Sequence, residues 1–509
     1  MATVSDAEPR PIETNIPHRL DRLPWTRWHW LVVIGLGTVW ILDGLEVTIV
    51  GAIASRLTEA DSGIHLTDSQ VGTAAAIYVA GACLGALFFG YLTDRLGRKK
   101  LFIITLSLYL VATVATAFAH DFWWFAICRF FTGAGIGGEY AAINSAIDEL
   151  IPARVRGTVD LAINGSWWVG TAAGAALSLV LLDKGILAPD VGWRLAFGLG
   201  AVLGLGILLV RRNLPESPRW LMIHGRFRDA EAVVEQIERE VQEETRQPLP
   251  EPRGSIRIVP RGAIGFGEIA RTFAKRYPRR FTLGLALFVG QAFLYNAVFF
   301  TYALVLTKFY GVSSSSVGLY ILFFAVGNFL GPLLLGPLFD RWGRKPMIAT
   351  TYMGSGALLL LTAFLFKNGT LTATTQTIAW CVIFFFASAG ASSAYLTVSE
   401  IFPMETRAMA IAFFYAVGTA VGGISGPLLF GHLIQSGKPS SVFWGYVLGA
   451  SLMMLGGIAE VFFGVEAAGR HLEEVATPLS AEEAERRARE RAADPERGGR
   501  FTRGARSKS

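Results

Sequence analysis

The stretch Gly90-Tyr-Leu-Thr-Asp94-Arg95-Leu-Gly97-Arg98-Lys99 decides the fold, because the chain contains this pattern twice. It returns 246 positions later as Gly336-Pro-Leu-Phe-Asp340-Arg341-Trp-Gly343-Arg344-Lys345. Each copy follows one long apolar run and precedes another. Such a repeat at corresponding places of an apolar chain indicates a membrane protein built from two duplicated halves.

The composition also indicates a membrane protein. Of 509 residues, 52% are hydrophobic and only 17% are charged, and the mean hydropathy is +0.43. Apolar runs of about 20 residues can cross a hydrocarbon core of about 30 Å, and only helices let an open chain do so. The sequence predicts an all-α protein with twelve spans: 28–54, 69–92, 101–119, 122–147, 157–182, 191–211, 281–307, 316–339, 346–366, 374–399, 408–434 and 442–465.

These spans divide the chain into five parts. We expect a cytoplasmic N-terminal arm (1–27), a six-helix bundle (28–211), a cytoplasmic mid-chain loop (212–278), a second six-helix bundle (279–465) and a charged cytoplasmic tail (466–509). Lysine and arginine gather in alternate loops, so the positive-inside rule places both termini in the cytoplasm. The net charge of +6 then reflects topology and not a nucleic-acid-binding face. We expect a monomer in a plasma membrane, specifically a bacterial inner membrane.

The loops and tail carry further local patterns. Residues 229–244 are amphipathic at helical spacing, 248–260 form a proline-rich linker, and 266–277 predict a short interfacial helix. In the tail, acid–base pairs at i,i+4 spacing predict a solvated helix; the pairs are Glu482/Arg486, Glu483/Arg487 and Glu485/Arg489. The basic end, 497–508, is expected to be disordered.

A second motif is also duplicated. Glu149-Leu-Ile-Pro152-Ala-Arg-Val-Arg156 has its counterpart 251 positions later in Glu400-Ile-Phe-Pro403-Met-Glu-Thr-Arg407. Each proline ends a helix and leaves an acid and a base beside the first repeated loop. Acids interleaved with bases predict a latch, meaning a set of ion pairs that hold the two halves together. The alternative is positive-inside topology alone, which needs the cations but not the acids.

The first span contains two carboxylates, Asp43 and Glu46, at a spacing that puts them on one helix face. An ionisable side chain at membrane depth is costly and indicates a functional site. Arg129 in the fourth span is the expected partner, because a rise of about 1.5 Å per residue places it at a matching depth. The pattern predicts a proton-exchanging acid held near an arginine. The alternative is a pair of acids fixed to neighbouring helices for packing.

The chain as a whole resembles the major facilitator superfamily. Pro215-Glu216-Ser217-Pro218-Arg219-Trp220-Leu221 resembles the sugar-porter signature, and the segment from Arg129 to Glu139 resembles metabolite:proton and aromatic-acid:proton symporters. In aromatic-acid symporters the first span carries Asp-Gly-aromatic-Asp, where this chain has Asp43, Gly44, Leu45 and Glu46. The resemblance implies two six-helix halves that rock about a central substrate site.

The resemblance also implies roles for particular residues. Asp43, Glu46 and Arg129 would couple transport to protons. Residues of both repeated loops and both acid–proline–arginine turns would form a cytoplasmic latch: Gly90, Asp94, Arg95, Gly97, Arg98, Glu149, Arg156, Glu216 and Arg219 with Asp340, Arg341, Gly343, Arg344, Glu400 and Arg407.

Three amides and one tyrosine are the candidate substrate contacts. Asn164, Gln291 and Asn296 stand at spacings that resemble sugar-binding positions of sugar porters, and Tyr395 stands where those proteins keep a tryptophan. The Gly-Pro pair that precedes this tryptophan is replaced here, which argues against a dedicated hexose transporter. Amides offer both a donor and an acceptor to a substrate. The alternative is that they fasten helices to one another.

These patterns predict a transporter and not an enzyme, since no nucleophile–base pair, phosphate loop or metal-ligand cluster is present in the sequence. The leading hypothesis is proton-coupled symport of a small polar metabolite, with an organic or aromatic acid preferred to a sugar or polyol. No cofactor is expected besides the proton as coupling ion, and no nucleic-acid partner. A passive facilitator, a drug/proton antiporter and a transporter-like membrane sensor remain as alternatives.

Overall fold

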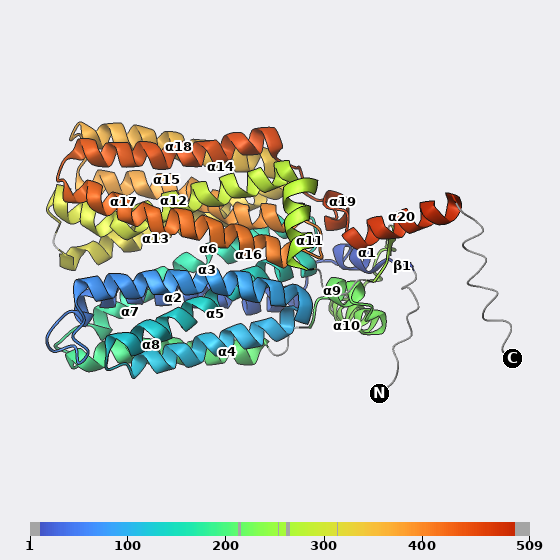
Figure 1. The fold of residues 1–509 in the computed structure, drawn as a ribbon, viewed down its shortest axis with the longest axis horizontal. Coiled ribbons are helices and arrows are strands. Elements are labelled where there is room, and N and C mark those ends of the chain that lie inside the picture. The colour runs from blue at the N-terminus through green and yellow to red at the C-terminus, as the bar shows by residue number, and fades with distance from the viewer. Residues whose placement is uncertain (1–10, 212–214, 253, 261–264, 313, 494–509) are drawn as a thin grey trace.

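Two helical bundles lie side by side and enclose the core between them (Figure 1). The computed structural model describes residues 11–211, 215–252, 254–260, 265–312 and 314–493. The first bundle consists of α2 (Arg27–Leu57), α3 (Asp68–Leu96), α4 (Arg98–Ala117), α5 (Phe122–Leu150), α6 (Arg156–Gly165), α7 (Trp167–Leu181) and α8 (Pro189–Arg211). The second consists of α12 (Pro278–Tyr310), α13 (Ser314–Arg341), α14 (Arg344–Lys367), α15 (Ala373–Ile401), α16 (Arg407–Gly418), η2 (Thr419–Gly423), α17 (Ile424–Gln435) and α18 (Pro439–Phe463).

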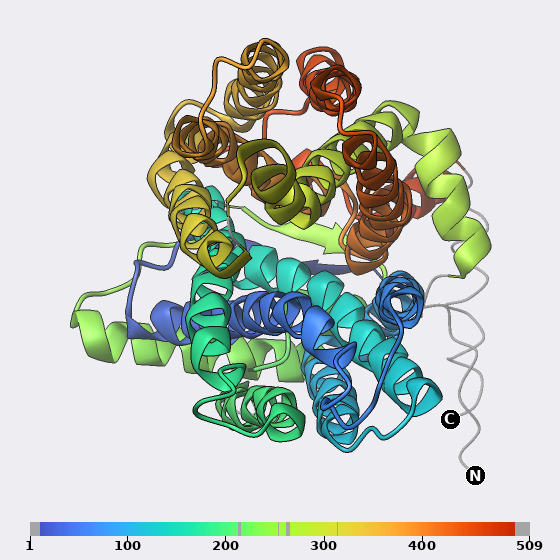
Figure 2. The same ribbon diagram turned by 90° about the vertical axis from the view of Figure 1, so that its left-hand side faces the viewer.

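The helices of the described part of the chain make twelve membrane-length passages, which confirms the expected fold. Within the described residues, ten helical stretches are long and apolar enough to cross a membrane. The other two passages fall short for local reasons. The α5 helix carries Arg129 and Glu139 among its apolar residues, and the fifth passage is divided at Ser166 into α6 and α7. Viewed from the end, the passages group into two halves (Figure 2).

The two repeated loops turn on a single glycine each. Gly97 lies between α3 and α4 at φ +95°, and Gly343 lies between α13 and α14 at φ +108°. L-residues with a side chain rarely adopt this region. A Cβ atom at Gly97 would also lie 2.2 Å from an oxygen of Glu216, and one at Gly343 would lie 2.5 Å from an oxygen of Glu466. Both glycines therefore permit the turn and the approach of an acid.

Replacing Gly97 by Ala should lower the stability of the protein. The strained φ alone costs about 1–3 kcal/mol, and Glu216 would have to move. A thermal-unfolding midpoint in detergent measures the effect. Gly354→Ala is the matched control, because Gly354 is inside α14 with nothing within 4 Å of a Cβ and a helical alanine is favoured by about 0.5–1 kcal/mol. Equal midpoints for the two variants would contradict the argument.

A small extramembrane layer covers one end of the bundles, which we call the terminus-bearing end (Figure 1). It contains β1 (Ile12–Thr14), α1 (Ile16–Asp21), α9 (Pro218–Ile223), α10 (Phe227–Thr245), β2 (Ile256–Ile258), α11 (Phe266–Arg271), η1 (Thr272–Arg276), α19 (Leu472–Val475) and α20 (Leu479–Ala493). The amphipathic pattern of α10 is confirmed, because Val234, Ile237 and Val241 are buried while the helix ends in exposed polar residues.

Two local expectations need correction. The proline-rich linker contains strand β2, which pairs antiparallel with β1 of the N-terminal arm; a partner so distant in sequence leaves no local signal. In α20, Glu482 pairs with Arg276 of η1 and not with Arg486, because η1 lies alongside the tail helix. The pairs Glu483–Arg487 (2.5 Å) and Glu485–Arg489 (3.6 Å) are formed. Residues 497–508 lie outside the described residues.

Candidate functional site

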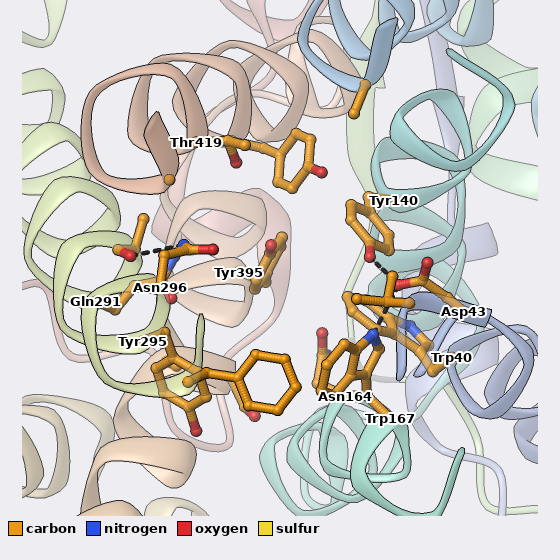
Figure 3. A pocket seen from close by; sticks show the side chains of 18 of the residues that line it. Trp40, Asp43, Tyr140, Asn164, Trp167, Gln291, Tyr295, Asn296, Tyr395 and Thr419 are labelled. Atoms are coloured by element: carbon orange, nitrogen blue, oxygen red, sulfur yellow. Dashed lines mark hydrogen bonds between the residues drawn. The ribbon is translucent and has the colours of Figure 1, made fainter. Parts of the chain in front are cut away.

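A cavity of about 230 Å³ lies between the two halves. Its walls combine aromatic rings, amides and one carboxylate, and both halves contribute (Figure 3). The first half supplies Trp40, Asp43, Tyr78, Tyr140, Asn164, Trp167 and Trp168. The second half supplies Gln291, Tyr295, Asn296, Phe299, Tyr395 and Tyr415.

Among the described residues that line the cavity, Asp43 is the one acid, and its hydrogen-bond donors are neutral. Its Oδ2 accepts a hydrogen bond from Trp167 Nε1 at 2.7 Å and another from the Tyr140 hydroxyl. Its Oδ1 is buried without a hydrogen-bond partner. The position depends on close packing of α2 against α7, since a Cβ atom on Gly44 would lie 1.9 Å from the Trp167 carbonyl oxygen. Glycine beside Asp43 thus brings the indole to the carboxylate.

Glu46 lies behind the cavity wall in a different environment. Arg129 donates to Glu46 at 2.5 Å, and both side chains are buried. The Arg129 guanidinium also lies over the ring of Tyr78, 4.5 Å from the ring centroid. Tyr78 lines the cavity, whereas Glu46 and Arg129 are not among its described lining residues. The three intramembrane charges predicted from the sequence are therefore divided: Glu46 has the arginine, and Asp43 faces the cavity without it.

The predicted substrate contacts all line the cavity, but their hydrogen bonds differ. Asn164 uses its amide nitrogen on Asn144 Oδ1 (3.1 Å) and the Asp160 carbonyl (2.9 Å), so it fastens helices. Asn296 donates to the Ala292 carbonyl at 2.7 Å. Within the part of the chain that the structure describes, the Gln291 side chain makes no hydrogen bond. Gln291 is thus the amide with the most capacity left for a ligand.

The sequence reasoning missed the aromatic walls. Trp40 stacks on Tyr140 with ring centroids 4.5 Å apart, and Tyr395 lies edge-on to Trp40 at 5.8 Å. Tyr295 donates from its hydroxyl to Asn328 Oδ1 at 2.8 Å, which gives Asn328 a structural role. A signal existed for some of them: Trp40 precedes Asp43 by three residues, and Tyr295 follows Gln291 by four, so each pair shares a helix face.

The latch residues form ion pairs within each half. In the first half Arg98 contacts Glu149 at 2.7 Å and Asp94 at 3.4 Å. In the second half Arg344 contacts Glu400 at 3.0 Å and Asp340 at 2.8 Å. All four pairs lie at the terminus-bearing end. The two halves repeat the same geometry, as the duplicated motifs predict.

Other contacts of the same residues cross between the halves. Asp94 accepts from the Met409 N–H at 3.0 Å, and Asp340 accepts from the Thr158 N–H at 2.7 Å. Two reciprocal ion pairs add to these bonds: Arg407 with Glu149 at 3.4 Å, and Arg156 with Glu400 at 3.6 Å. These arginines and glutamates are fully buried. The terminus-bearing end is therefore closed.

Glutamates cap the two repeated loops from outside the membrane passages. Glu216 accepts from the backbone N–H of Arg98 (2.9 Å) and Lys99 (3.3 Å). Burial raises the pKa of Glu216 despite these bonds and the nearby Arg98. In the second half Glu466 accepts from Arg344 N–H at 2.8 Å and the next N–H at 3.2 Å. Glu466 was missed, although it follows the twelfth span as Glu216 follows the sixth.

Two predicted latch residues lie outside the ion-pair network. Arg95 and Arg341 are exposed, and Arg95 places its guanidinium over the ring of Tyr91 at 4.7 Å. Neither forms an ion pair with a described acid. Gly90 does lie where the halves approach, since a Cβ there would be 2.4 Å from the Cβ of Ala412.

Arg219 joins the chain termini instead of pairing across the repeated loops. It contacts Glu473 of the tail at 2.9 Å and Asp21 of the arm at 3.4 Å. Asp21 also contacts Arg156 at 3.4 Å and His471 at 2.5 Å. Burial would raise the pKa of Asp21, but Arg219, His471 and Arg156 together lower it to about 2. The hydrogen bond to Asp21 in turn raises the pKa of His471.

The Asp21–His471 contact should make stability depend on pH. Because the pKa of His471 is raised in the folded protein, its contribution is complete below about pH 6.5, the ordinary histidine value, and is lost as pH rises through the raised value. The thermal-unfolding midpoint of wild-type protein should fall over that interval, and that of His471→Ala should fall less. His120→Ala, at an exposed site, is the control and should keep the wild-type profile.

Two six-helix halves around a central cavity, closed at one end by reciprocal ion pairs, define a major facilitator superfamily transporter. The chain belongs to the family described as "Sugar (and other) transporter", which it matches over residues 28–479. Members of this family are transporters and not enzymes, and the chain is a multi-pass membrane protein.

The relatives are named for different transported substrates. The chain is 28% identical over 461 residues to the niacin transporter NiaP of Acinetobacter baylyi, covering 90% of this chain and 98% of that protein. It is 24% identical over 410 residues to a D-xylose transporter of Levilactobacillus brevis, covering 78% and 85%. The solved structure of the proton:xylose symporter XylE bound to 6-bromo-6-deoxy-D-glucose is similar in fold, with TM-score 0.72, 19% identity and coverage of 88% and 98%.

Proposed function

We propose that this protein is a proton-coupled symporter that carries a small, polar, ring-bearing metabolite, bound in an electrically neutral form. The observation that carries the proposal is Asp43, a buried carboxylate on the cavity wall whose hydrogen-bond donors are all uncharged. Substrate and proton would thus share one cavity, which alternates between a state closed at the terminus-bearing end and a state open there.

The environments of the two acids separate their roles. A buried carboxylate is kept ionised by a cation, and Glu46 has Arg129 at 2.5 Å. Asp43 has only a phenol and an indole, so it is the group that exchanges a proton when the cavity opens. Its two donors come from α5 and α7, and a change in its charge alters their bonds to α2. XylE, which shares the fold, is named as a proton symporter.

The cavity chemistry also restricts the charge of the substrate. No arginine, lysine or histidine is among the described residues that line it, so an anion would find no counter-charge on these walls. Stacked rings suit a flat or cyclic substrate, and amides suit its hydroxyl or carbonyl groups. A sugar, a nicotinamide-like amide, or an aromatic acid neutralised by the transported proton meets these conditions. If the substrate is an organic acid, as expected from the sequence, we propose that it binds in its neutral, protonated form.

Orientation follows from the charge distribution. The repeated basic loops lie at the terminus-bearing end, so the positive-inside rule favours a cytoplasmic location for that end. Positions such as Lys100 and Lys184 lie at opposite ends, each exposed. A single cysteine at Lys100 should resist a membrane-impermeant maleimide in intact cells, and one at Lys184 should react.

Transport by the purified protein tests the proposal directly. Proteoliposomes with an acidic exterior should accumulate labelled nicotinamide, nicotinate or xylose above the outside concentration, and a protonophore should abolish the accumulation. A passive facilitator would equilibrate these compounds without accumulating them, and a proton antiporter would expel them. Accumulation that is the same with and without the pH gradient would overturn the proposal.

A further inference from the structure

Asp160 is a buried acid that neither the cavity nor the latch uses. It lies in α6, and its exposed fraction is 0%. Both of its carboxylate oxygens are enclosed and without a hydrogen-bond partner among the described residues. An enclosed carboxylate without any partner is an unfavourable place for a negative charge. The side chain therefore needs an explanation that packing does not give.

The groups that face Asp160 do not supply a free cation. Helix α6 packs against α2, α5, α7, α13 and α15. Acids predominate around the side chain, and α7 carries no titratable group. The acids of α2 lie beside the cavity. The titratable groups facing Asp160 are Asp148 on α5, Tyr395 and Glu400 on α15, Arg344 on α14, Asp340 on α13 and Arg156 on α6 itself.

The nearby arginines are already engaged by other acids. Arg344 contacts Glu400 and Asp340 at 3.0 and 2.8 Å. Arg156 contacts Glu400 at 3.6 Å and Asp21 at 3.4 Å. Asp148, the neighbouring acid, has its Oδ1 3.9 Å from Arg156 Nε, and its Oδ2 accepts a hydrogen bond from the Ser399 hydroxyl. Asp160 is left without a counter-charge while the halves are together.

A line of polar side chains connects this position to the cavity. On α5, Tyr140, Asn144 and Asp148 follow one another every four residues and so share a face. Tyr140 bonds to Asp43, and Asn144 bonds to Asn164 on the cavity wall. Asp160 is one helical turn, about 6 Å, from Asn164. Asp160 thus lies between the cavity and the latch. It is at the interface of the two halves, which move apart when the terminus-bearing end opens.

We propose that Asp160 is a second proton-binding site, occupied while the terminus-bearing end is closed and vacated when that end opens. In the closed state α13 and α15 cover the side chain and exclude water. When they move away from α6, water can hydrate the carboxylate and stabilise its ionised form. One proton bound only in the closed state makes the closed-to-open ratio rise up to tenfold for each unit that pH falls.

Pulsed electron paramagnetic resonance in lipid nanodiscs tests the proposal without substrate. Spin labels at Lys100→Cys and Trp342→Cys, which are exposed positions beside the two repeated loops on opposite halves, report the separation of the halves. The native Cys83, Cys128 and Cys381 are replaced by alanine in this background. The short-distance population should grow as pH falls.

Asp160→Asn should remove this pH dependence and keep the closed population high, because asparagine imitates the protonated acid. Asp160→Ser, a smaller neutral side chain, serves the same purpose if the asparagine variant does not fold. The matched control is Glu460→Gln in α18, another buried acid with both oxygens unpartnered but away from the interface of the halves. It should retain the wild-type slope.

A wild-type slope in both Asp160 variants would overturn the proposal, and so would a slope lost equally in Glu460→Gln. Because the measurement needs neither substrate nor a pH gradient across a membrane, its outcome is separate from that of the symport assay. Loss of slope in the Asp160 variants, with transport shown to be uncoupled from protons, would leave a pH-controlled gate on a facilitator.

Discussion

Replacing Asp43 by Asn should abolish proton-driven accumulation while exchange of substrate across the membrane continues. Asparagine keeps the size of the side chain and can still accept hydrogen bonds from Trp167 and Tyr140, so the cavity should stay formed. It cannot take up or release a proton. The ratio of inside to outside substrate under an imposed pH gradient should fall from many-fold to about one, with counterflow close to wild type.

Counterflow and accumulation have to be measured on the same vesicles. Glu460→Gln is a control for removing a buried carboxylate elsewhere in the membrane and should accumulate substrate normally. Accumulation by the Asp43→Asn protein would assign coupling to another group. Loss of both activities would instead give Asp43 a role in binding the substrate.

Replacing Glu46 by Gln should have a different main effect, a loss of stability. Arg129 would remain buried at 2% exposure without its carboxylate. Removing one partner of a buried ion pair typically costs about 3–5 kcal/mol. The thermal-unfolding midpoint should therefore fall well below that of Asp43→Asn. The cation–π contact with Tyr78 is too weak to replace the lost charge.

The paired variant separates stability from coupling. Glu46→Gln combined with Arg129→Gln removes both charges and should recover part of the lost stability, as buried ion pairs replaced together often do. If Glu46→Gln is as stable as wild type, the ion pair is not what holds Arg129. If Glu46→Gln uncouples transport at normal stability, the exchanging acid is Glu46.

Much of the fold followed from residues that are close in sequence. The duplicated loops predict Arg98 near Asp94 and Arg344 near Asp340, because each acid and its arginine are only four residues apart on either side of a tight glycine turn. The membrane passages are also predictable, because an apolar run of membrane-spanning length is visible within the segment itself. Strand β2 could not be predicted, since β1, the strand with which it pairs, is some 240 positions away in the sequence.

The residue types of the site could be predicted from the sequence, but their pairing in space could not. Two acids and an arginine at membrane depth indicated a charged centre, yet nothing local decides which acid receives Arg129. That choice depends on α2 and α7 meeting at Gly44 and Gly170, which turns Trp167 onto Asp43. The reciprocal pairs of Arg407 and Arg156 likewise depend on how the halves dock. Glu466, by contrast, is predictable from the sequence, because it follows the twelfth span as Glu216 follows the sixth.

The reciprocal pairing has a consequence for assembly. Among the described residues Arg407 contacts an acid, Glu149, only across the interface, and Arg156 adds Glu400 there to its contact with Asp21, so a bundle made alone loses buried ion pairs. Two fragments produced from separate messages and cut inside the connecting loop would restore these ion pairs when they bind each other. Co-expression should then yield a complex that purifies through a tag on one fragment, whereas either fragment by itself should be degraded.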